Sequence, residues 1–147
     1  MAKCWGNDGL YFNEVNMTFY LNKTFHQLFV VSEETHKDFI KLSNDNNPLH
    51  INEQFAQSKG FKGIVVHGNI LNAFISYFIG ECLPTKDVII HSQSIQFKKP
   101  VYLNTRLMFS AEVVGIYDSV NAVEFKFKFQ NSEEIIVAKG NIQIGII

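Results

Sequence analysis

The chain has 147 residues, 46% of them hydrophobic and 18% charged, which is typical of one soluble domain with an ordinary core. Its 13 basic and 14 acidic side chains give a net charge of −1, which lacks the positive field of a nucleic-acid-binding protein. Two distant cysteines exclude a disulfide framework, no stretch is long and apolar enough for a membrane span, and the start does not resemble a signal peptide, so a cytoplasmic protein without membrane partners is expected.

The N-terminal part of the chain shows little pattern before the first strand. Residues 1–20 are weakly patterned and predict an N-terminal arm or an extra edge element. Residues 24–31, TFHQLFVV, predict a short strand. Neither a repeat nor a linker interrupts the sequence, so we expect one domain over residues 1–147.

A helix is predicted directly after this strand. Ser32 is a suitable N-cap, and two glutamates follow it in the positive first turn. The helix is expected to run to about Leu42. The residues expected to face inward are Phe39, Ile40 and Leu42. Pro48 ends any helix there, and a second short helix is expected over 52–58.

Residues 69–81 predict a longer, mostly buried helix. Its broad apolar face comprises Ile70, Leu71, Phe74, Tyr77 and Phe78. A second stripe is small or polar and comprises Asn69, Asn72, Ser76 and Gly80. A helix that is apolar over most of its girth is expected to be wrapped by a sheet.

The last third of the chain is strand-like. The predicted strands cover residues 88–97, 107–116, 120–130 and 134–146. The third of them alternates four apolar side chains, from Val123 to Phe129, with polar ones, which indicates a strand with one wet face. Strands joined by tight turns favour an antiparallel sheet. We therefore predict an α+β fold, in which a curved antiparallel sheet surrounds one long helix.

The densest polar cluster is the segment SNDNNPLH, residues 43–50. On an unbroken helix Asp45 and His50 would point about 140° apart, so they converge only if the backbone breaks, and Pro48 provides that break. A carboxylate beside an imidazole is a general acid–base pair that could position a water molecule. Composition alone favours a solvated turn, because Ser, Asn, Asp and Pro are turn residues.

A second cluster, VHGN, precedes the long helix. The backbone N–H of Gly68 would lie at the positive end of the helix dipole, where it suits a developing oxyanion or a thioester oxygen. The alternative is that Gly68 only permits a tight turn. His67 is equally suited to a core or capping position, and nothing separate marks it as catalytic.

Three segments together resemble the MaoC-like (R)-specific enoyl-CoA hydratases. FIKLSNDNNPLHINEQFA (39–56) resembles the hydratase-2 motif of that family, and FKGIVVHGNILNAFIS (61–76) resembles the segment that follows it. SQSIQFKKPVYLNTRL (92–107) is similar to the family's later strand-and-loop signature. The resemblance extends from about residue 24 to the C-terminus.

The resemblance implies a single hot-dog domain and a homodimer, possibly a higher oligomer, with an acyl-thioester tunnel near the subunit interface. It implies that Asp45 and His50 activate water and that Gly68 N–H holds the thioester oxygen, with Asn69 beside it. Supporting roles are implied for Asn47, which would brace the loop, and for Ser76. No metal or organic cofactor is implied, and coenzyme A or acyl carrier protein would carry the substrate.

The chain departs from the family pattern at several positions. Asn44 stands where the family usually has Gly, and Asn is among the better substitutes if that position has positive φ. Asn69 replaces an apolar residue, which could change the acyl tunnel. Asn104 and Thr105 replace the usual Gly-Asp turn.

The expected reaction is reversible hydration of trans-2-enoyl thioesters to (R)-3-hydroxyacyl thioesters. Four lysines could contact the phosphates of the carrier, namely Lys59, Lys62, Lys98 and Lys99. Two alternatives stay open, a hot-dog acyl-thioester hydrolase and a non-catalytic acyl-thioester-binding protein. Chain length, carrier and physiological direction are not specified by the sequence.

Overall fold

The computed structural model describes residues 18–147, so most of the expected arm over residues 1–20 lies outside the described residues. The elements, in chain order, are β1 (Thr24–Val30), α2 (Glu33–Ser43), α3 (Pro48–Ile51), α4 (Glu53–Ser58), α5 (Ile70–Tyr77), the π-helical turn η1 (Phe78–Cys82), β2 (Val88–Phe97), β3 (Arg106–Tyr117), the 3-10 turn η2 (Asp118–Val120), β4 (Ala122–Gln130) and β5 (Ile136–Ile146).

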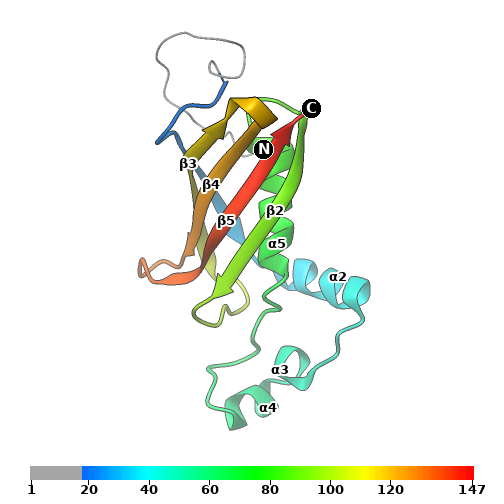
Figure 1. Ribbon diagram of the computed structural model, residues 1–147. Helices are drawn as coiled ribbons and strands as arrows, with labels where there is room; N and C mark the ends of the chain where they lie inside the picture. Colours follow the sequence, from blue (N-terminus) through cyan, green and yellow to red (C-terminus); the bar gives the residue numbers. More distant parts are fainter. Residues whose placement is uncertain (1–17) are drawn as a thin grey trace.

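The five strands form one antiparallel sheet in the order β1-β3-β4-β5-β2 (Figure 1). The expected alternation in β4 is confirmed, because Val123, Phe125, Phe127 and Phe129 are buried while the residues between them are more exposed. β4 begins two residues later than expected because residues 118–120 form η2. Register shifts in β2 and β3 add local twist, which helps the sheet to curve.

The sheet packs on α5 and η1 through aromatic rings. The Phe78 ring lies 5.6 Å from Phe25, 4.9 Å from Phe109 and 5.9 Å from Phe125, measured between ring centroids. These three partners belong to β1, β3 and β4, so one helical side chain contacts three strands. The expected arrangement of one long central helix against a curved antiparallel sheet is therefore confirmed.

The central helix differs in detail from its expected form. It ends as the π-helical turn η1, whose wider winding turns Phe78, Ile79 and Cys82 all toward the core. Tyr77, expected on the apolar face, is 42% exposed, and Ile75 is fully buried in its place. The chain by itself thus leaves one side of α5 open, along the small and polar stripe.

The start of α2 is confirmed, and part of its expected inner face is wrong. The Ser32 hydroxyl accepts a hydrogen bond from Thr35 N–H, as an N-cap does. Leu42, expected to face inward, is 83% exposed. It lies six residues after His36, which at 3.6 residues per turn is about 120° around the helix. The fully buried residue of α2 is His36.

Among residues 18–147, no helix is both long and apolar enough to cross a bilayer.

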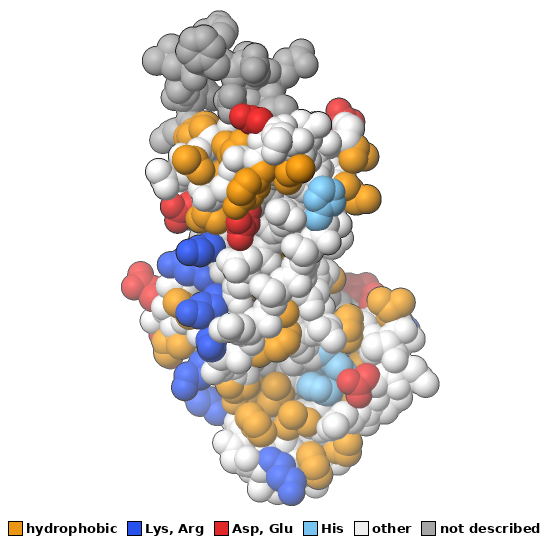
Figure 2. Space-filling view, in the orientation of Figure 1, with side chains coloured by type: hydrophobic (Ala, Val, Ile, Leu, Met, Phe, Trp, Pro, Cys, Tyr) orange, Lys and Arg blue, Asp and Glu red, His pale blue; other side chains and the backbone are white. Residues whose placement is uncertain are grey.

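The described residues share one hydrophobic cluster that includes the inner face of the sheet and the buried face of α5 and η1. The loops at one end of this cluster carry α2, α3 and α4 (Figure 1). The polar segment SNDNNPLH belongs to that end, where Figure 2 shows a histidine beside an acidic side chain at the surface.

Candidate active site

The segment between α2 and α3 turns sharply, and three residues explain the turn. α2 ends at Asn44, which adopts a left-handed conformation with φ 53°, so the positive φ considered for this position is present. Asn47 then caps α3 by accepting a hydrogen bond from Leu49 N–H at 3.0 Å. Pro48 occupies the first turn of α3, where its missing N–H costs nothing. The backbone break expected at Pro48 is therefore present, in the form of a new helix start.

His50 projects from α3 toward the segment before α5. Its Nδ1 lies 2.6 Å from the carbonyl oxygen of Val65. A carbonyl oxygen can only accept, so Nδ1 carries a hydrogen, and in the neutral form of the ring Nε2 holds an unshared electron pair. The second ring nitrogen of His50 is consequently available as a proton acceptor.

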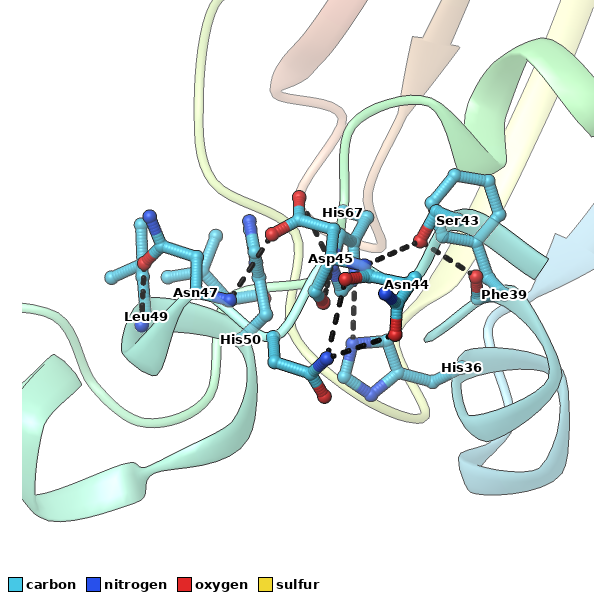
Figure 3. A network of polar contacts seen from close by, with 11 residues as sticks. His36, Phe39, Ser43, Asn44, Asp45, Asn47, Leu49, His50 and His67 are labelled. Carbon is cyan, nitrogen blue, oxygen red and sulfur yellow. Dashed lines mark hydrogen bonds and ion pairs between the residues drawn. The ribbon is translucent and has the colours of Figure 1, made fainter. Parts of the chain in front are cut away.

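His67 is the residue that contacts Asp45 directly. Its Nε2 lies 3.1 Å from the main-chain oxygen of Asp45 and 3.5 Å from the Oδ2 atom of the same residue (Figure 3). The Asp45 carboxylate also accepts the backbone N–H of Asn47 at 3.1 Å. These contacts hold the carboxylate in place, although its side chain is 49% exposed. Sequence reasoning assigned no role to His67.

Asp45, His50 and His67 form one cluster. One side-chain nitrogen or oxygen from each of the three lies within 4.8 Å of the others. The rings of His50 and His67 are stacked, with centroids 3.7 Å apart and planes inclined by 27°. Figure 3 shows this cluster between the end of α2 and the start of α3. No direct hydrogen bond joins Asp45 to His50 among the described residues. The separation of up to 4.8 Å between their polar atoms suits a bridging water.

The cluster is a poor metal site despite its residue types. His50 and His67 lie nearly parallel, so their ring-plane lone pairs do not converge on one point. The Nε2 atom of His67 is already committed to Asp45 as a hydrogen-bond donor. Binding of a divalent ion to Nε2 of His67 would require its hydrogen bond to Asp45 to break.

A cleft of about 420 Å³ opens beside the two histidines. His50, His67 and Gly68 line it, together with Phe97 from the end of β2. Within residues 18–147 no protein acceptor lies within hydrogen-bond distance of Gly68 N–H. A Cβ atom at this position would lie 2.9 Å from the Phe97 ring, so glycine keeps the backbone accessible beside that ring. The free N–H at the start of α5 suits an oxygen that gains negative charge.

The remaining site candidates are divided between this cleft and other surfaces. Asn69 lines the cleft, and its Oδ1 accepts a hydrogen bond from Asn72 at 2.9 Å. Asn47 lies in the loop and contacts the Asp45 carboxylate through its backbone, an arrangement suited to bracing. Ser76 is exposed on α5 and is not part of the cleft wall, so a single chain does not bring it to the site. Asp45 lies behind His67 rather than in the cleft wall.

The electrostatics of the cluster favour neutral histidines. Burial lowers the pKa of His67 below its usual 6.5, and His50 acts in the same direction, while Asp45 opposes both. Burial also lowers the pKa of His36, with smaller effects from His67 and His50. Positive charges on adjacent stacked rings would repel one another. At neutral pH, His36 and His67 are therefore uncharged.

These lowered pKa values predict a loss of stability in mild acid. Unfolded His36 and His67 take up protons at about pH 6.5, whereas the folded chain resists protonation, so the unfolded state binds more protons as pH falls. The free energy of unfolding should be lower at about pH 5.5 than at about pH 7.5. Urea denaturation at several pH values measures this slope. Replacing His36 by Leu should make this slope smaller, because it removes one of the two buried histidines, and a flat profile of the natural chain over this range contradicts the prediction.

Two functional candidates, His36 and His67, were missed by sequence reasoning. His67 directly precedes Gly68, in a segment that the sequence already singled out. The contact of His67 with Asp45 was not predicted. His36 lies three residues before Phe39 and four before Ile40, which places it on the same helical face as these apolar side chains. A histidine on the inner stripe of a helix was the available signal.

Comparison with known structures places the chain in a structural class. An (R)-hydratase from Aeromonas caviae involved in PHA biosynthesis matches with a TM-score of 0.82 at 23% identity, over 88% of this chain and 98% of that one. An R-hydratase from Pseudomonas aeruginosa matches with a TM-score of 0.80 at 26% identity, over 87% of this chain and 82% of that one. The fold is the hot-dog fold, as expected, and the protein is an α+β hot-dog protein with a cluster of Asp45, His50 and His67 near the start of its central helix.

Sequence comparison then identifies the family. The profile described as "MaoC like domain" matches residues 13–134, and the chain belongs to this family. A relative in Rhodospirillum rubrum named (R)-specific enoyl-CoA hydratase is 35% identical over 96 residues, covering 65% of this chain and 67% of that protein. A mitochondrial 3-hydroxyacyl-[acyl-carrier-protein] dehydratase of Arabidopsis thaliana is 29% identical over 114 residues, covering 76% and 68%. The expected family and the hydratase–dehydratase class are thereby confirmed.

Proposed function

We propose that the protein catalyses the reversible hydration of trans-2-enoyl thioesters to (R)-3-hydroxyacyl thioesters. The observation that carries this proposal is that His50 and the free N–H of Gly68 line one cleft, while a carboxylate oxygen of Asp45 lies within 4.8 Å of a ring nitrogen of His50. The (R) configuration follows the names of the relatives.

In the forward direction, water adds across the C2–C3 double bond. His50 Nε2 and the Asp45 carboxylate hold the water between them, and the pair takes its proton as the oxygen bonds to C3. The hydrogen bond from His50 Nδ1 to Val65 orients the ring and leaves Nε2 basic. The pair then returns a proton to C2, so the reaction is balanced without an external acid.

The thioester oxygen gains negative charge as C2 develops carbanion character. Gly68 N–H, which lines the cleft at the positive end of α5, would donate a hydrogen bond to this oxygen. Asn69 in the same wall would contact the acyl or thioester group. The reverse reaction, dehydration, uses the same groups.

The carrier is proposed to be coenzyme A or acyl carrier protein. Lys98 and Lys99 follow β2 and line the cleft, so two of the four lysines suggested for phosphate contact lie beside the site. The names of the relatives include both an enoyl-CoA hydratase and an acyl-carrier-protein dehydratase. No metal or organic cofactor takes part in the proposed reaction.

The test is an ultraviolet assay of crotonyl-CoA, in which loss of the conjugated absorbance reports hydration. The protein is dialysed against a chelator, the product is analysed for chirality, and free thiol is measured in parallel. We expect (R)-3-hydroxybutyryl-CoA, no thiol release and no effect of the chelator.

The alternatives are outcomes of the same assay. Thiol release without hydration assigns a thioester hydrolase. If CoA thioesters do not react, the same substrates on acyl carrier protein are tested. Binding without turnover on either carrier assigns a non-catalytic acyl-thioester-binding protein and overturns the proposed function.

We also propose that the protein forms a homodimer through the free edge of β2. This strand ends the sheet, and three large apolar side chains of it are exposed, Ile89, Ile90 and Phe97. Figure 1 shows the strand at the border of the sheet, where its unpaired edge is open to a second copy. Phe97 also lines the cleft, so such an interface would lie next to the site.

Replacing Ile89 by Lys is expected to weaken this dimer. The new charge would be buried against the second copy at a side chain that is 51% exposed in the single chain. Light scattering coupled to size exclusion should show a dimer for the natural chain and a concentration-dependent monomer for Ile89→Lys. The control is Leu42→Lys on α2, which should stay dimeric. A monomeric natural chain contradicts the proposal.

A further inference from the structure

His36 is a buried histidine that the mechanism above does not use. It lies on the inner face of α2 and is only 4% exposed. Its Nε2 lies 3.1 Å from Nδ1 of His67, a residue 31 positions later that is 3% exposed. Two buried histidines in direct hydrogen bond must divide donor and acceptor roles between them.

The direction of this hydrogen bond follows from the other end of His67. The Nε2 atom of His67 contacts the main-chain oxygen and the carboxylate of Asp45, both of which only accept. His67 therefore carries its hydrogen on Nε2, and its Nδ1 is an acceptor. It follows that His36 donates its own Nε2–H. The hydrogen bonds thus run in one direction, from His36 through His67 to Asp45.

We propose that His36 is a positioning residue of the active site, which keeps His67 neutral and in the form that donates to Asp45. This proposal rests on the hydratase function proposed above. If His36 did not donate, Nδ1 of His67 could take up a proton and become a cation beside His50, whose ring is stacked 3.7 Å away. A cation there would oppose protonation of His50, the step that takes the proton from water.

The groups that face His67 are few among the described residues. His36 approaches from α2, Asp45 from the loop, and His50 from α3. The Phe39 ring covers a further side at 5.2 Å between centroids. Asp45 raises the pKa of His67, whereas burial and the adjacent His50 lower it. The hydrogen bond from His36 acts in the same direction as burial, because it occupies Nδ1, the atom at which His67 would take up a proton.

The test compares His36→Leu, which cannot donate, with His36→Gln, whose amide nitrogen can donate over a similar reach. His26→Leu is the matched control, because His26 is exposed on β1. Nitrogen NMR of histidine-labelled protein reports which ring nitrogen of His67 is protonated at each pH. In the natural chain we expect protonated Nε2, unprotonated Nδ1 and a coupling across the hydrogen bond to His36.

In His36→Leu we expect His67 to protonate at higher pH than in the natural chain. The value of kcat should fall by about 10- to 100-fold with KM little changed. Losses of this size are found when a hydrogen-bond partner that orients a metal-binding histidine is removed. His36→Gln should restore both the titration of His67 and most of kcat. His26→Leu should behave as the natural chain.

The proposal is overturned if His67 in the natural chain carries its hydrogen on Nδ1, a result that needs no variant to fold. It is also overturned if His36→Leu leaves the titration of His67 and kcat unchanged. Absence of turnover in the natural chain would instead refute the hydratase function. The NMR measurements on His67 remain decisive for His36 in that case.

Discussion

Asp45→Asn is expected to lower kcat by roughly 10²- to 10⁴-fold, the usual contribution of a general base. The amide keeps the shape of the side chain and can still accept the backbone N–H of Asn47. The main-chain oxygen of Asp45 still receives the hydrogen bond of His67. The variant should therefore fold, lose the negative charge that holds water opposite His50, and bind substrate with similar KM.

The matched control is Asp38→Asn on α2. Asp38 is exposed and pairs with Lys41 at 3.0 Å, so its replacement is the same chemical change outside the site. Surface pairs of this kind contribute little to stability. His50→Gln should lose as much as Asp45→Asn, and the double variant should lose little more, because the two residues act as a unit. An Asp45→Asn enzyme within about tenfold of the natural kcat would contradict the assignment.

Phe109→Ala is expected to have the largest effect on stability, about 3–5 kcal/mol of unfolding free energy. Phe109 is fully buried on the inner face of β3. Its ring centroid lies 4.9 Å from that of Phe78 in η1 and 4.9 Å from that of Phe129 in β4. Removing the ring leaves a cavity between the helix and the sheet that these neighbours cannot fill without moving.

The measurement is urea denaturation followed by circular dichroism. Leu42→Ala is the control, because this side chain is 83% exposed, and its loss should cost less than about 0.5 kcal/mol. A small loss for Phe109→Ala, below about 1 kcal/mol, would show that the helix is not packed on the sheet as described. A large loss of unfolding free energy for Leu42→Ala would indicate that Leu42 faces inward, as the sequence predicted.

The secondary structure was predictable because its causes are local. The alternation from Val123 to Phe129 follows from the two-residue period of a strand, and one buried face is enough to specify it. The Ser32 cap and the start of α3 at Pro48 depend on residues within a few positions. Helical facing was less predictable: Leu42 and Tyr77 are apolar, but which side of α2 or α5 meets the core depends on contacts with distant strands.

The family resemblance located Asp45, His50 and Gly68 in two short segments, and these segments do meet at one cleft. Their detailed relation was not predictable. Asp45 was expected beside His50, whereas its direct contact is with His67, 22 residues away. Ser76 was expected to support the site, but in the single chain it lies on the open side of α5.

Most of the strands and helices and the α+β class followed from the sequence alone, because periodicity, capping and turn residues act over a few positions; α3 and the π-helical winding of η1 were not expected. The contact of His67 with Asp45 and the hydrogen bond between His36 and His67 could be found only in the folded chain. Those hydrogen bonds join α2, the loop after it and the start of α5. Their directions depend on how these distant segments pack, because each buried ring nitrogen must find its partner in the folded chain.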